Sequence, residues 1–374
     1  MTYQHLFSRA RDAAPDRLHF AAHSHHLWPD ASWDGHAEAW NDAAVLADHK
    51  LDRVFGEVIP EAQRHIAAEL SLPDPATIAF APNTHELLFR IVSALPIDRP
   101  RVLASDGEFH SFRRQSLRWV EAGRIYLTTV PLDQVVETAE AGQFDLIFTS
   151  QVQFNAGRVL EGIERLAALA RPEGPWVVID GYHGFMALPT DLSAIADRIF
   201  YLSGGYKYAM AGEGVCFLHA PPGFGLRPEF TGWFAAFDDL AAKQGGVGYA
   251  PDGRRFLGST FDPSALYRFN AVQRMLAHEG LTTAAISAHC DGLKARFLAA
   301  NPLPDLSLIS DPRARFLAFK GDLAPALHDL LSDRGVVTDL RDDVLRIGFA
   351  LYQSDGDVDD LLCRLANIFE TALV

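Results

Sequence analysis

The sequence is poor in cysteine and has no long apolar run. Its 374 residues include three cysteines, at positions 216, 290 and 363, and no CxxC pair. This spacing excludes a disulfide framework and a cysteine-rich zinc site, and it is typical of a reducing compartment. No stretch of about 18 apolar residues could span a bilayer, and the N-terminus lacks a basic segment followed by an apolar one. We therefore expect a cytoplasmic protein with no membrane partner.

Positive charge is also scarce. Lys and Arg total 33 against 48 Asp and Glu, so the net charge at pH 7 is −15, and the isoelectric point is about 5.4. A surface of this sign repels phosphate backbones, so no nucleic-acid partner is expected. Apolar residues make up 48% and charged residues 22%, as in average globular proteins, which excludes a disordered or fibrous chain.

The middle of the chain alternates short apolar runs with helical stretches. Strands are predicted at 77–80, 101–105, 125–130, 144–150, 176–180, 199–203 and 215–219. Helices are predicted at 83–95, 109–122 and 160–171. This alternation predicts an α/β fold whose mostly parallel seven-stranded sheet is covered on both faces.

The pattern changes after residue 262. Helices at 263–279, 282–299, 324–334 and 358–373, with strands at 315–320 and 344–350, predict a small α+β unit. We therefore divide the chain into an N-terminal segment at 1–50, a large domain at 51–262 and a small C-terminal domain at 263–374. The N-terminal segment is predicted to be helical apart from the loop HSHHLWP at 23–29.

An aspartate and a lysine follow neighbouring predicted strands. Asp180 ends the run 176–180, and Lys207 lies in the loop after the run 199–203. Ligands of open α/β sheets bind at the carboxyl edge, where both side chains should emerge. A lysine can form a Schiff base with pyridoxal 5′-phosphate (PLP), while an aspartate keeps the pyridine nitrogen protonated. The alternative is a loop-capping Asp beside an exposed Lys, and the pair alone does not decide between the two.

Two further segments suit such a cofactor. Asn83, Thr84 and His85 follow a predicted strand and open a helix, whose N-terminus favours a phosphate, although Asn or Thr there also serves as an ordinary N-cap. Phe109 follows the strand at 101–105, where its ring could stack on a planar cofactor or simply belong to the core. Together with the Asp and Lys, these segments favour a cofactor site.

The motifs resemble fold-type I PLP enzymes of the class V aminotransferase superfamily, and within it kynureninase-like proteins. The resemblance covers nearly the whole chain and rests on NTH (83–85), EFHSFRRQ (108–115), QVQFNAGR (151–158), DGYHGF (180–185), SGGYKYAMAGEG (203–214), FTGWF (230–234), GST (258–260) and RIGFALY (346–352). It implies an aspartate aminotransferase-like fold, PLP as cofactor, an amino acid as substrate, and a homodimer with the active site at its interface.

The resemblance also assigns residues. Lys207 would form the Schiff base and move protons, with Asp180 at the pyridine nitrogen. The other implied cofactor-binding residues are His183, Phe109, Asn83, Thr84, His85, Ser203, Tyr206, Trp233, Ser259 and Thr260, the last two from across the dimer interface. The implied substrate-binding residues are Arg346, which would hold the carboxylate, and His25, His26 and Trp28 of the N-terminal loop. No metal is implied.

The implied reaction is hydrolytic Cβ–Cγ cleavage of a kynurenine-like amino acid through a quinonoid. The loop HSHHLWP departs from the Asn-containing loop of kynureninases, so a class V aminotransferase or lyase reaction on another amino acid stays open. Cysteine desulfuration is not expected, because Cys216 lies in a predicted strand and Cys290 and Cys363 lie in predicted helices. A catalytically inactive binding module is not favoured, because the implied catalytic residues are all present.

A metal-dependent hydrolase is the alternative from another class of enzyme. Its ligands would come from His23, His25 and His26, together with Asp180 and His183. The sequence has no HExxH motif, and the resemblance assigns Asp180 and His183 to the cofactor.

Overall fold

A seven-stranded sheet forms the centre of the protein, which is seen here in a computed structural model that describes residues 2–239 and 245–372. Within these residues its strands are β2 (Ile78–Ala81), β3 (Arg101–Ser105), β4 (Tyr126–Val130), β5 (Leu146–Ser150), β6 (Trp176–Asp180), β7 (Ile199–Gly204) and β8 (Cys216–His219). Their order is β2-β8-β7-β6-β5-β3-β4; β8 is antiparallel to both neighbours and the other pairs are parallel. The predicted α/β class and seven-stranded, mostly parallel sheet are confirmed.

The central strands are apolar because helices and loops cover both faces of the sheet. Every residue of β5 and β7 is buried, and in β6 only Asp180 is partly exposed. A strand covered on both sides has no solvent face, so its sequence is a continuous apolar run without alternation. The connecting helices are α5 (Thr84–Ser93), α6 (His110–Glu121), α7 (Val135–Ala141) and α8 (Ile163–Leu169).

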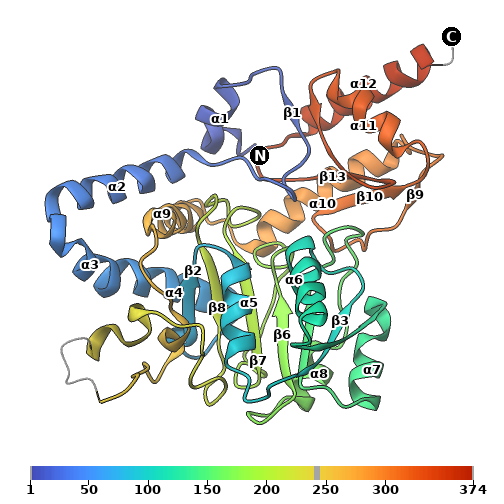
Figure 1. Cartoon of the computed structure of the whole chain (residues 1–374). Helices are drawn as coiled ribbons and strands as arrows, with labels where there is room; N and C mark the ends of the chain where they lie inside the picture. Colours follow the sequence, from blue (N-terminus) through green and yellow to red (C-terminus); the bar gives the residue numbers. More distant parts are fainter. Residues whose placement is uncertain (1, 240–244, 373–374) are drawn as a thin grey trace.

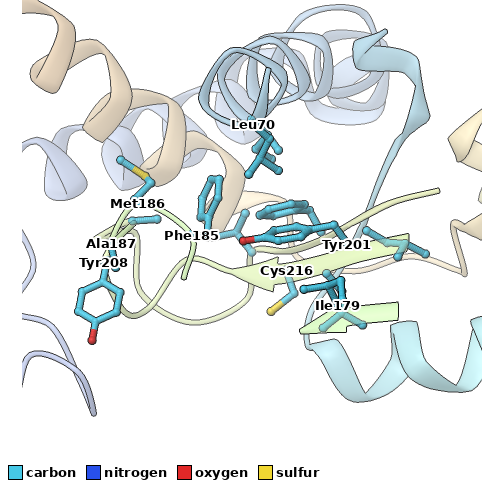
Figure 2. Packing of buried hydrophobic residues seen from close by; sticks show 14 of the residues in the cluster. Leu70, Ile179, Phe185, Met186, Ala187, Tyr201, Tyr208 and Cys216 are labelled. Carbon is cyan, nitrogen blue, oxygen red and sulfur yellow. The ribbon is translucent and has the colours of Figure 1, made fainter. Parts of the chain in front are cut away.

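Aromatic residues fill the core beside the sheet. Tyr201 of β7 and Phe185 both belong to this core (Figure 2). The Tyr201 hydroxyl donates a hydrogen bond of 2.8 Å to Gln151 Oε1. A buried phenol without an acceptor would cost about 1–3 kcal/mol, so this bond stabilises the packing. The first residue after β6, Gly181, lies directly against the Tyr201 ring, where any Cβ would overlap the ring. The turn that follows β6 therefore requires glycine at this position.

The C-terminal unit combines helices with a second sheet. Its helices are α9 (Ser264–His278), α10 (Thr283–Ala299), α11 (Ala324–Ser332) and α12 (Asp355–Ala372). Within the described residues the sheet has the antiparallel order β12-β13-β10-β9, with β12 (Asp339–Arg341), β13 (Val344–Gly348), β10 (Phe316–Lys320) and β9 (Ser307–Leu308). The sequence pattern does not predict β9 or β12, because two or three residues are too short to show a period. Residue 373, the predicted end of the last helix, lies outside the described residues.

The N-terminal segment contacts residues from the far end of the chain. Its strand β1 (Leu18–His19) pairs in parallel with β11 (Val336–Val337), and Figure 1 shows this blue segment beside the red C-terminal elements. Its helices are α1 (Ser8–Asp12) and α2 (Asp30–Leu46), and α2 packs along α9. The helices α3 (Lys50–Arg53) and α4 (Ile59–Leu70) follow α2 along the chain. The boundaries 1–50, 51–262 and 263–374 stay predictions.

Replacing Ile147 by Ala tests the core position of β5. The Ile147 side chain is fully buried, so Ile147→Ala should leave a cavity and lower the free energy of unfolding by about 2–5 kcal/mol. Urea unfolding measures this loss. The control is Leu308→Ala on β9, whose exposed side chain should contribute within about 0.5 kcal/mol. Equal losses in the two variants would contradict the core position of Ile147.

Candidate active site

The parallel strands bring Ser150 and Asp180 to one edge of the sheet. Ser150 ends β5 and pairs in register with Asp180, which ends β6, and Asp180 pairs in turn with Leu202 of β7. The Asp180 Oδ1 accepts a hydrogen bond of 2.9 Å from the backbone N–H of Tyr182, which turns the chain away from the strand. The Asp180 carboxylate therefore lies at the carboxyl edge, as the sequence predicts.

The loop between β7 and β8 carries Lys207. The loop is closed by backbone hydrogen bonds of 2.8 Å from Gly205 N to the Val215 carbonyl and from Ala211 N to the Gly205 carbonyl. At Gly204 a Cβ would overlap the Tyr182 hydroxyl, so glycine permits this close approach. The loop turns the Lys207 side chain inward, and only 5% of the residue is exposed.

Lys207 and Asp180 line the same cavity, whose volume is about 290 Å³. The other lining residues are Pro82, Asn83, Thr84, His85, Phe109, Ser111, Ser150, Val152, Phe154, Tyr182, His183, Tyr206, Glu213, Gly214 and Cys216. Small-molecule sites fall at roughly 300–1,000 Å³, so this volume suits one cofactor-sized molecule. The structure thus brings together eight of the residues that the resemblance assigns to the cofactor: Lys207, Asp180, His183, Phe109, Asn83, Thr84, His85 and Tyr206.

Burial controls the ionisation of the lysine and the aspartate. Burial lowers the pKa of Lys207 to about 7; the Asp180 carboxylate acts in the opposite direction, and nearby arginines add to the lowering. Burial raises the pKa of Asp180 to about 6, against the effects of the Tyr182 N–H and the Lys207 amine. Three ring centroids surround Lys207 Nζ, those of Tyr182, Tyr206 and Phe109, at 4.6, 5.1 and 5.6 Å. The amine is therefore poised to change its protonation near neutral pH.

The N-terminus of α5 forms one end of the cavity. Asn83 Oδ1 accepts a hydrogen bond of 2.9 Å from Glu86 N, so the Asn83 side chain is the N-cap of the helix. Thr84 and His85 belong to the first turn, where backbone N–H groups have no acceptor within the helix. Together with the helix dipole, these groups favour a phosphate.

These residues fit PLP. The cavity offers an amine to bind the aldehyde, a carboxylate for the ring nitrogen and a helix N-terminus for the phosphate. His183 Nδ1 is buried and has no hydrogen-bond partner among the residues that the structure describes, so it is free to meet a ligand. The ring of Phe109 forms part of the cavity wall, where the sequence predicts a ring-stacking residue.

A buried carboxylate that the sequence analysis assigns no role lies behind this cavity. Glu108 accepts hydrogen bonds from Ser105 Oγ, Ser150 Oγ and, at 2.9 Å, Ser150 N. Burial raises the pKa of Glu108 to about 7, although these hydrogen bonds lower it. Because Glu108 precedes Phe109 and its acceptor atoms hold the end of β5, it anchors the turn that carries the Phe109 ring.

Other cavity residues escape sequence reasoning for different reasons. Ser150, Phe154 and Tyr182 are ordinary residue types in loops or at strand ends. The strand order, had it been known, would have indicated that Ser150 lies near Asp180, because β5 lies beside β6. The short distance in sequence from Asp180, two residues, would have indicated that Tyr182 lies at the cavity.

Several predicted cofactor residues do not line the cavity of this chain. The Ser203 hydroxyl is fully buried and donates to the Gly181 carbonyl at 3.2 Å. Trp233 lies elsewhere, where its Nε1 donates to Thr260 Oγ1 at 3.2 Å, and Ser259 is next to this pair. A role for Trp233, Ser259 and Thr260 at the cofactor therefore depends on a second copy of the chain.

The N-terminal loop lies against the lysine loop instead of lining the cavity. The His25 ring stacks on Tyr206 at 5.3 Å, and His26 N donates to the Tyr206 carbonyl, while the His26 ring packs on Tyr352 at 5.1 Å. The Trp28 ring covers the guanidinium of Arg268 at 5.2 Å. Arg268 in turn donates to the carbonyls of residues 211 and 213. In this chain the N-terminal loop therefore supports the loop between β7 and β8 that carries Lys207. Direct substrate contacts of His25, His26 and Trp28 stay a prediction.

Arg346 lies just outside the cavity wall. Its guanidinium donates to the carbonyl of Phe154, which lines the cavity, and pairs with Asp339, a residue that sequence reasoning does not single out. Burial lowers the pKa of Arg346 to about 10. The arginine thus stays charged at neutral pH beside the site.

No group of three or more His, Cys, Asp or Glu suited to a metal occurs in the described part of the chain, so the metal-hydrolase alternative finds no ligand set there. Across residues 2–239 and 245–372, no helix has the length and apolar character needed to cross a bilayer.

The chain is similar in sequence to isopenicillin N epimerases. It is 33% identical to that of Streptomyces clavuligerus over 205 residues, 51% of each chain, and 34% identical to that of Amycolatopsis lactamdurans over 222 residues, 54% of this chain and 51% of the other. It thus spans about half the length of these curated relatives. A probable cysteine desulfurase of Pseudomonas aeruginosa is 27% identical over 325 residues, 77% of this chain and 75% of that one. No protein-family model matches the sequence.

Solved structures share the whole fold. A cystine C–S lyase in complex with its product, cysteine persulfide, has a TM-score of 0.80 at 18% identity and covers 95% of this chain and 98% of its own. A C-DES variant with glycine covalently linked to the PLP cofactor has a TM-score of 0.81 at 18% identity, with coverage of 98% and 99%. A cysteine desulfurase from Escherichia coli has a TM-score of 0.79 at 18% identity, with coverage of 99% and 98%.

The chain therefore has the fold of PLP-dependent cysteine desulfurases. The sequence likenesses to isopenicillin N epimerases and to a probable cysteine desulfurase agree with this fold, and membership of the class V superfamily of PLP-dependent enzymes stays a proposal. None of the relatives named here is a kynureninase, so the kynureninase-like subgroup stays a prediction.

Glu108→Gln should change the pH dependence of stability. The folded state holds the Glu108 pKa at about 7, above the ordinary value of 4.5, so its contribution to stability is complete below pH 4.5 and is lost as pH rises to 7. Gln keeps the acceptor for Ser105 and Ser150 N and cannot ionise. The variant should therefore gain on the order of 2–3 kcal/mol relative to wild type between pH 5 and 8.

Urea unfolding at several pH values measures this difference. Glu121→Gln is the control, because the Glu121 side chain is 72% exposed and its substitution should not change the slope with pH. A Glu108→Gln difference that is constant with pH would show that Glu108 ionises normally.

Proposed function

We propose that the protein binds PLP covalently through Lys207 and uses it to act at the α-carbon of an amino acid. The observation that carries this proposal is that the buried Lys207 amine, the Asp180 carboxylate and the N-terminus of α5 meet in one cavity. These groups match the aldehyde, ring nitrogen and phosphate of one cofactor molecule. When bound, PLP supplies a ring that takes up the electron pair released at the α-carbon.

The surrounding residues bind, orient and move protons. Lys207, with a pKa of about 7, is suited to take the α-proton and return it near neutral pH. Asp180 keeps a proton on the ring nitrogen, and Phe109 holds the ring from the cavity wall. Arg346 holds the α-carboxylate of the substrate, a task suited to a guanidinium. The aromatic rings around Lys207 Nζ keep water from the amine.

Two reactions are candidates for the steps that follow. Hydrolytic Cβ–Cγ cleavage of a kynurenine-like amino acid is supported by Phe109 at the ring-stacking position and by Tyr206 before Lys207. Epimerisation at the α-carbon is supported by the sequence likeness to two isopenicillin N epimerases, at 33% and 34% identity. Transamination would use the same residues.

Cysteine desulfuration is not proposed, although relatives of that name share the fold. Cys216 lines the cavity, but its thiol is buried and burial raises its pKa to about 12, so almost no thiolate forms near neutral pH. Cys290 is buried in α10, and Cys363 is exposed on α12, neither of them at the cavity.

We also propose that the protein is a homodimer in which each copy completes the other's site. Phe230 and Trp233 lie in one exposed apolar segment, with 49% and 40% of their surface accessible. Ser259 and Thr260 lie beside Trp233 and away from the cavity of their own chain. A dimer would cover this segment and bring it to the partner's cofactor.

Lys207→Ala should abolish covalent cofactor binding. The wild-type protein, loaded with PLP, should show the visible absorbance of a lysine-bound cofactor, and borohydride should fix the cofactor to Lys207. The variant should show neither. Lys320→Ala is the control, because Lys320 lies on the surface of β10 with 55% of its side chain exposed. A reducible lysine-bound cofactor in Lys207→Ala would refute the assignment.

The reaction is identified by its products in deuterium oxide. The loaded protein is incubated with L-kynurenine and with other L-amino acids, and the products are followed by nuclear magnetic resonance. Anthranilate and alanine identify Cβ–Cγ hydrolysis. The D-enantiomer carrying α-deuterium identifies epimerisation, and a 2-oxo acid identifies transamination. If no amino acid exchanges its α-proton, the proposed action at the α-carbon is wrong.

A further inference from the structure

Three charged residues share one face of the hairpin formed by β12 and β13. Asp339 and Arg346 are directly opposite each other in the antiparallel register. Arg341 follows Asp339 by two residues, so both side chains of β12 leave the same face of the strand. The carboxylate of Asp339 therefore lies between two guanidinium groups.

Asp339 contacts both arginines. Its Oδ2 pairs with Arg346 Nη2, and its Oδ1 lies 3.3 Å from Arg341 Nη1. The side chains of Arg346, Asp339 and Arg341 are 2%, 12% and 36% exposed, so the cluster is largely shielded from water. His23 Nε2 lies 3.6 Å from Asp339 Oδ2, and burial lowers the His23 pKa well below its ordinary value, so His23 is neutral. Two positive charges and one negative charge leave the cluster with a single positive charge.

The cluster adjoins the cavity. Arg346 donates to the Phe154 carbonyl, and the Phe154 side chain lines the cavity. After burial and the opposing effect of Asp180, the charges of Arg346 and Arg341 are the next influences on the Lys207 pKa, and both lower it. The two guanidinium groups are therefore close enough to act on the reacting amine.

Both arginines keep donors for a ligand. The Nε atoms of Arg341 and Arg346 are buried, and neither has a hydrogen-bond partner among the residues described. A guanidinium has five N–H donors, and Arg346 uses one for Phe154 and one for Asp339. A buried donor without a partner is costly, so these groups favour an arriving acceptor.

We infer that Asp339 is a specificity-determining residue, which neutralises one of the two guanidinium groups so that Arg341 and Arg346 together accept a single carboxylate. This inference rests on the proposed function, because the carboxylate is that of the amino-acid substrate. A substrate with a second acid group near the cluster would place that group, unpaired, beside the Asp339 carboxylate. Selection by such a repulsive contact is a common source of specificity. The preferred substrates are therefore amino acids whose side chain is uncharged near the α-carbon.

Propionate and succinate test the inference, because succinate is propionate with a second carboxylate. Each is titrated into PLP-loaded protein at constant ionic strength, and binding is followed by the visible absorbance of the lysine-bound cofactor. The wild type should prefer propionate. Asp339→Asn removes the neutralising charge, so the ratio of the two dissociation constants should shift towards succinate by about tenfold or more, the size expected for one shielded charge contact.

Asp343→Asn is the matched control. Asp343 lies in the turn between the same two strands, where it faces Lys320 at 3.6 Å with 45% of its side chain exposed. Its substitution should leave the ratio unchanged. If Asp339 merely positions Arg346, then Asp339→Asn should weaken both probes together. A ratio within twofold of the wild type would therefore overturn the inference.

Arg341→Gln provides a second test that does not depend on the folding of Asp339→Asn. With Arg341 replaced, the cluster has no net charge, so binding of propionate should weaken by about tenfold or more. Unchanged binding of propionate would overturn the inference. A wild-type protein without lysine-bound absorbance would instead refute the proposed function. In that case, propionate and succinate would be titrated calorimetrically into the cofactor-free proteins. The ratio of their two dissociation constants in wild type and Asp339→Asn would then test the role of Asp339.

Discussion

The burial of the Lys207 amine is the constraint on which the rest of the site depends. Burial disfavours the charged amine and brings its pKa to about 7, and Asp180 supplies the attraction that prevents a larger shift. The same burial raises the pKa of Asp180, whose charged form is stabilised first by the hydrogen bond from the Tyr182 N–H and then by the Lys207 amine. Arg341 of β12 and Arg346 of β13 lower the pKa of Lys207 further. The protonation of Lys207 should therefore change when a ligand binds beside Asp180 or beside these two arginines.

The sheet topology places these opposing groups together. Parallel strands bring the ends of β5 and β6 to one edge, and the antiparallel return from β7 to β8 holds the lysine loop above that edge. The loop is also held from outside, since Arg268 of α9 donates to its carbonyls and Trp28 covers Arg268. The lysine is thus positioned by segments from the N-terminal, large and C-terminal parts of the chain. Such support from several rigid elements is what a precise site requires.

The sequence predicts well what depends on local pattern. Strands β3 and β6 have the predicted bounds, because their apolar runs are bounded by polar turns. Asp180 ends β6 and Lys207 follows β7, so the strand pattern also places both residues at one edge of the sheet. Partners that are distant in sequence are not predictable in this way. Glu108 meets Ser150 only once β3 and β5 pair, and Asp339 becomes part of the site only through the register of a three-residue strand. The resemblance assigns Ser203 to the cofactor, but it does not reveal that the Ser203 hydroxyl donates a hydrogen bond to the Gly181 carbonyl.

The parallel pair of β1 with β11 also determines the order in which the molecule can assemble. Leu18 pairs with Val336, so a chain leaving the ribosome carries β1 without its partner until most of the protein has been made. At roughly 5–20 residues per second, this interval is of the order of tens of seconds. The loop after β1, with His23 and Trp28, therefore takes its final place late. A nascent chain can form its central sheet early. The contacts of the N-terminal loop with the loop that carries Lys207 are complete only near the end of synthesis.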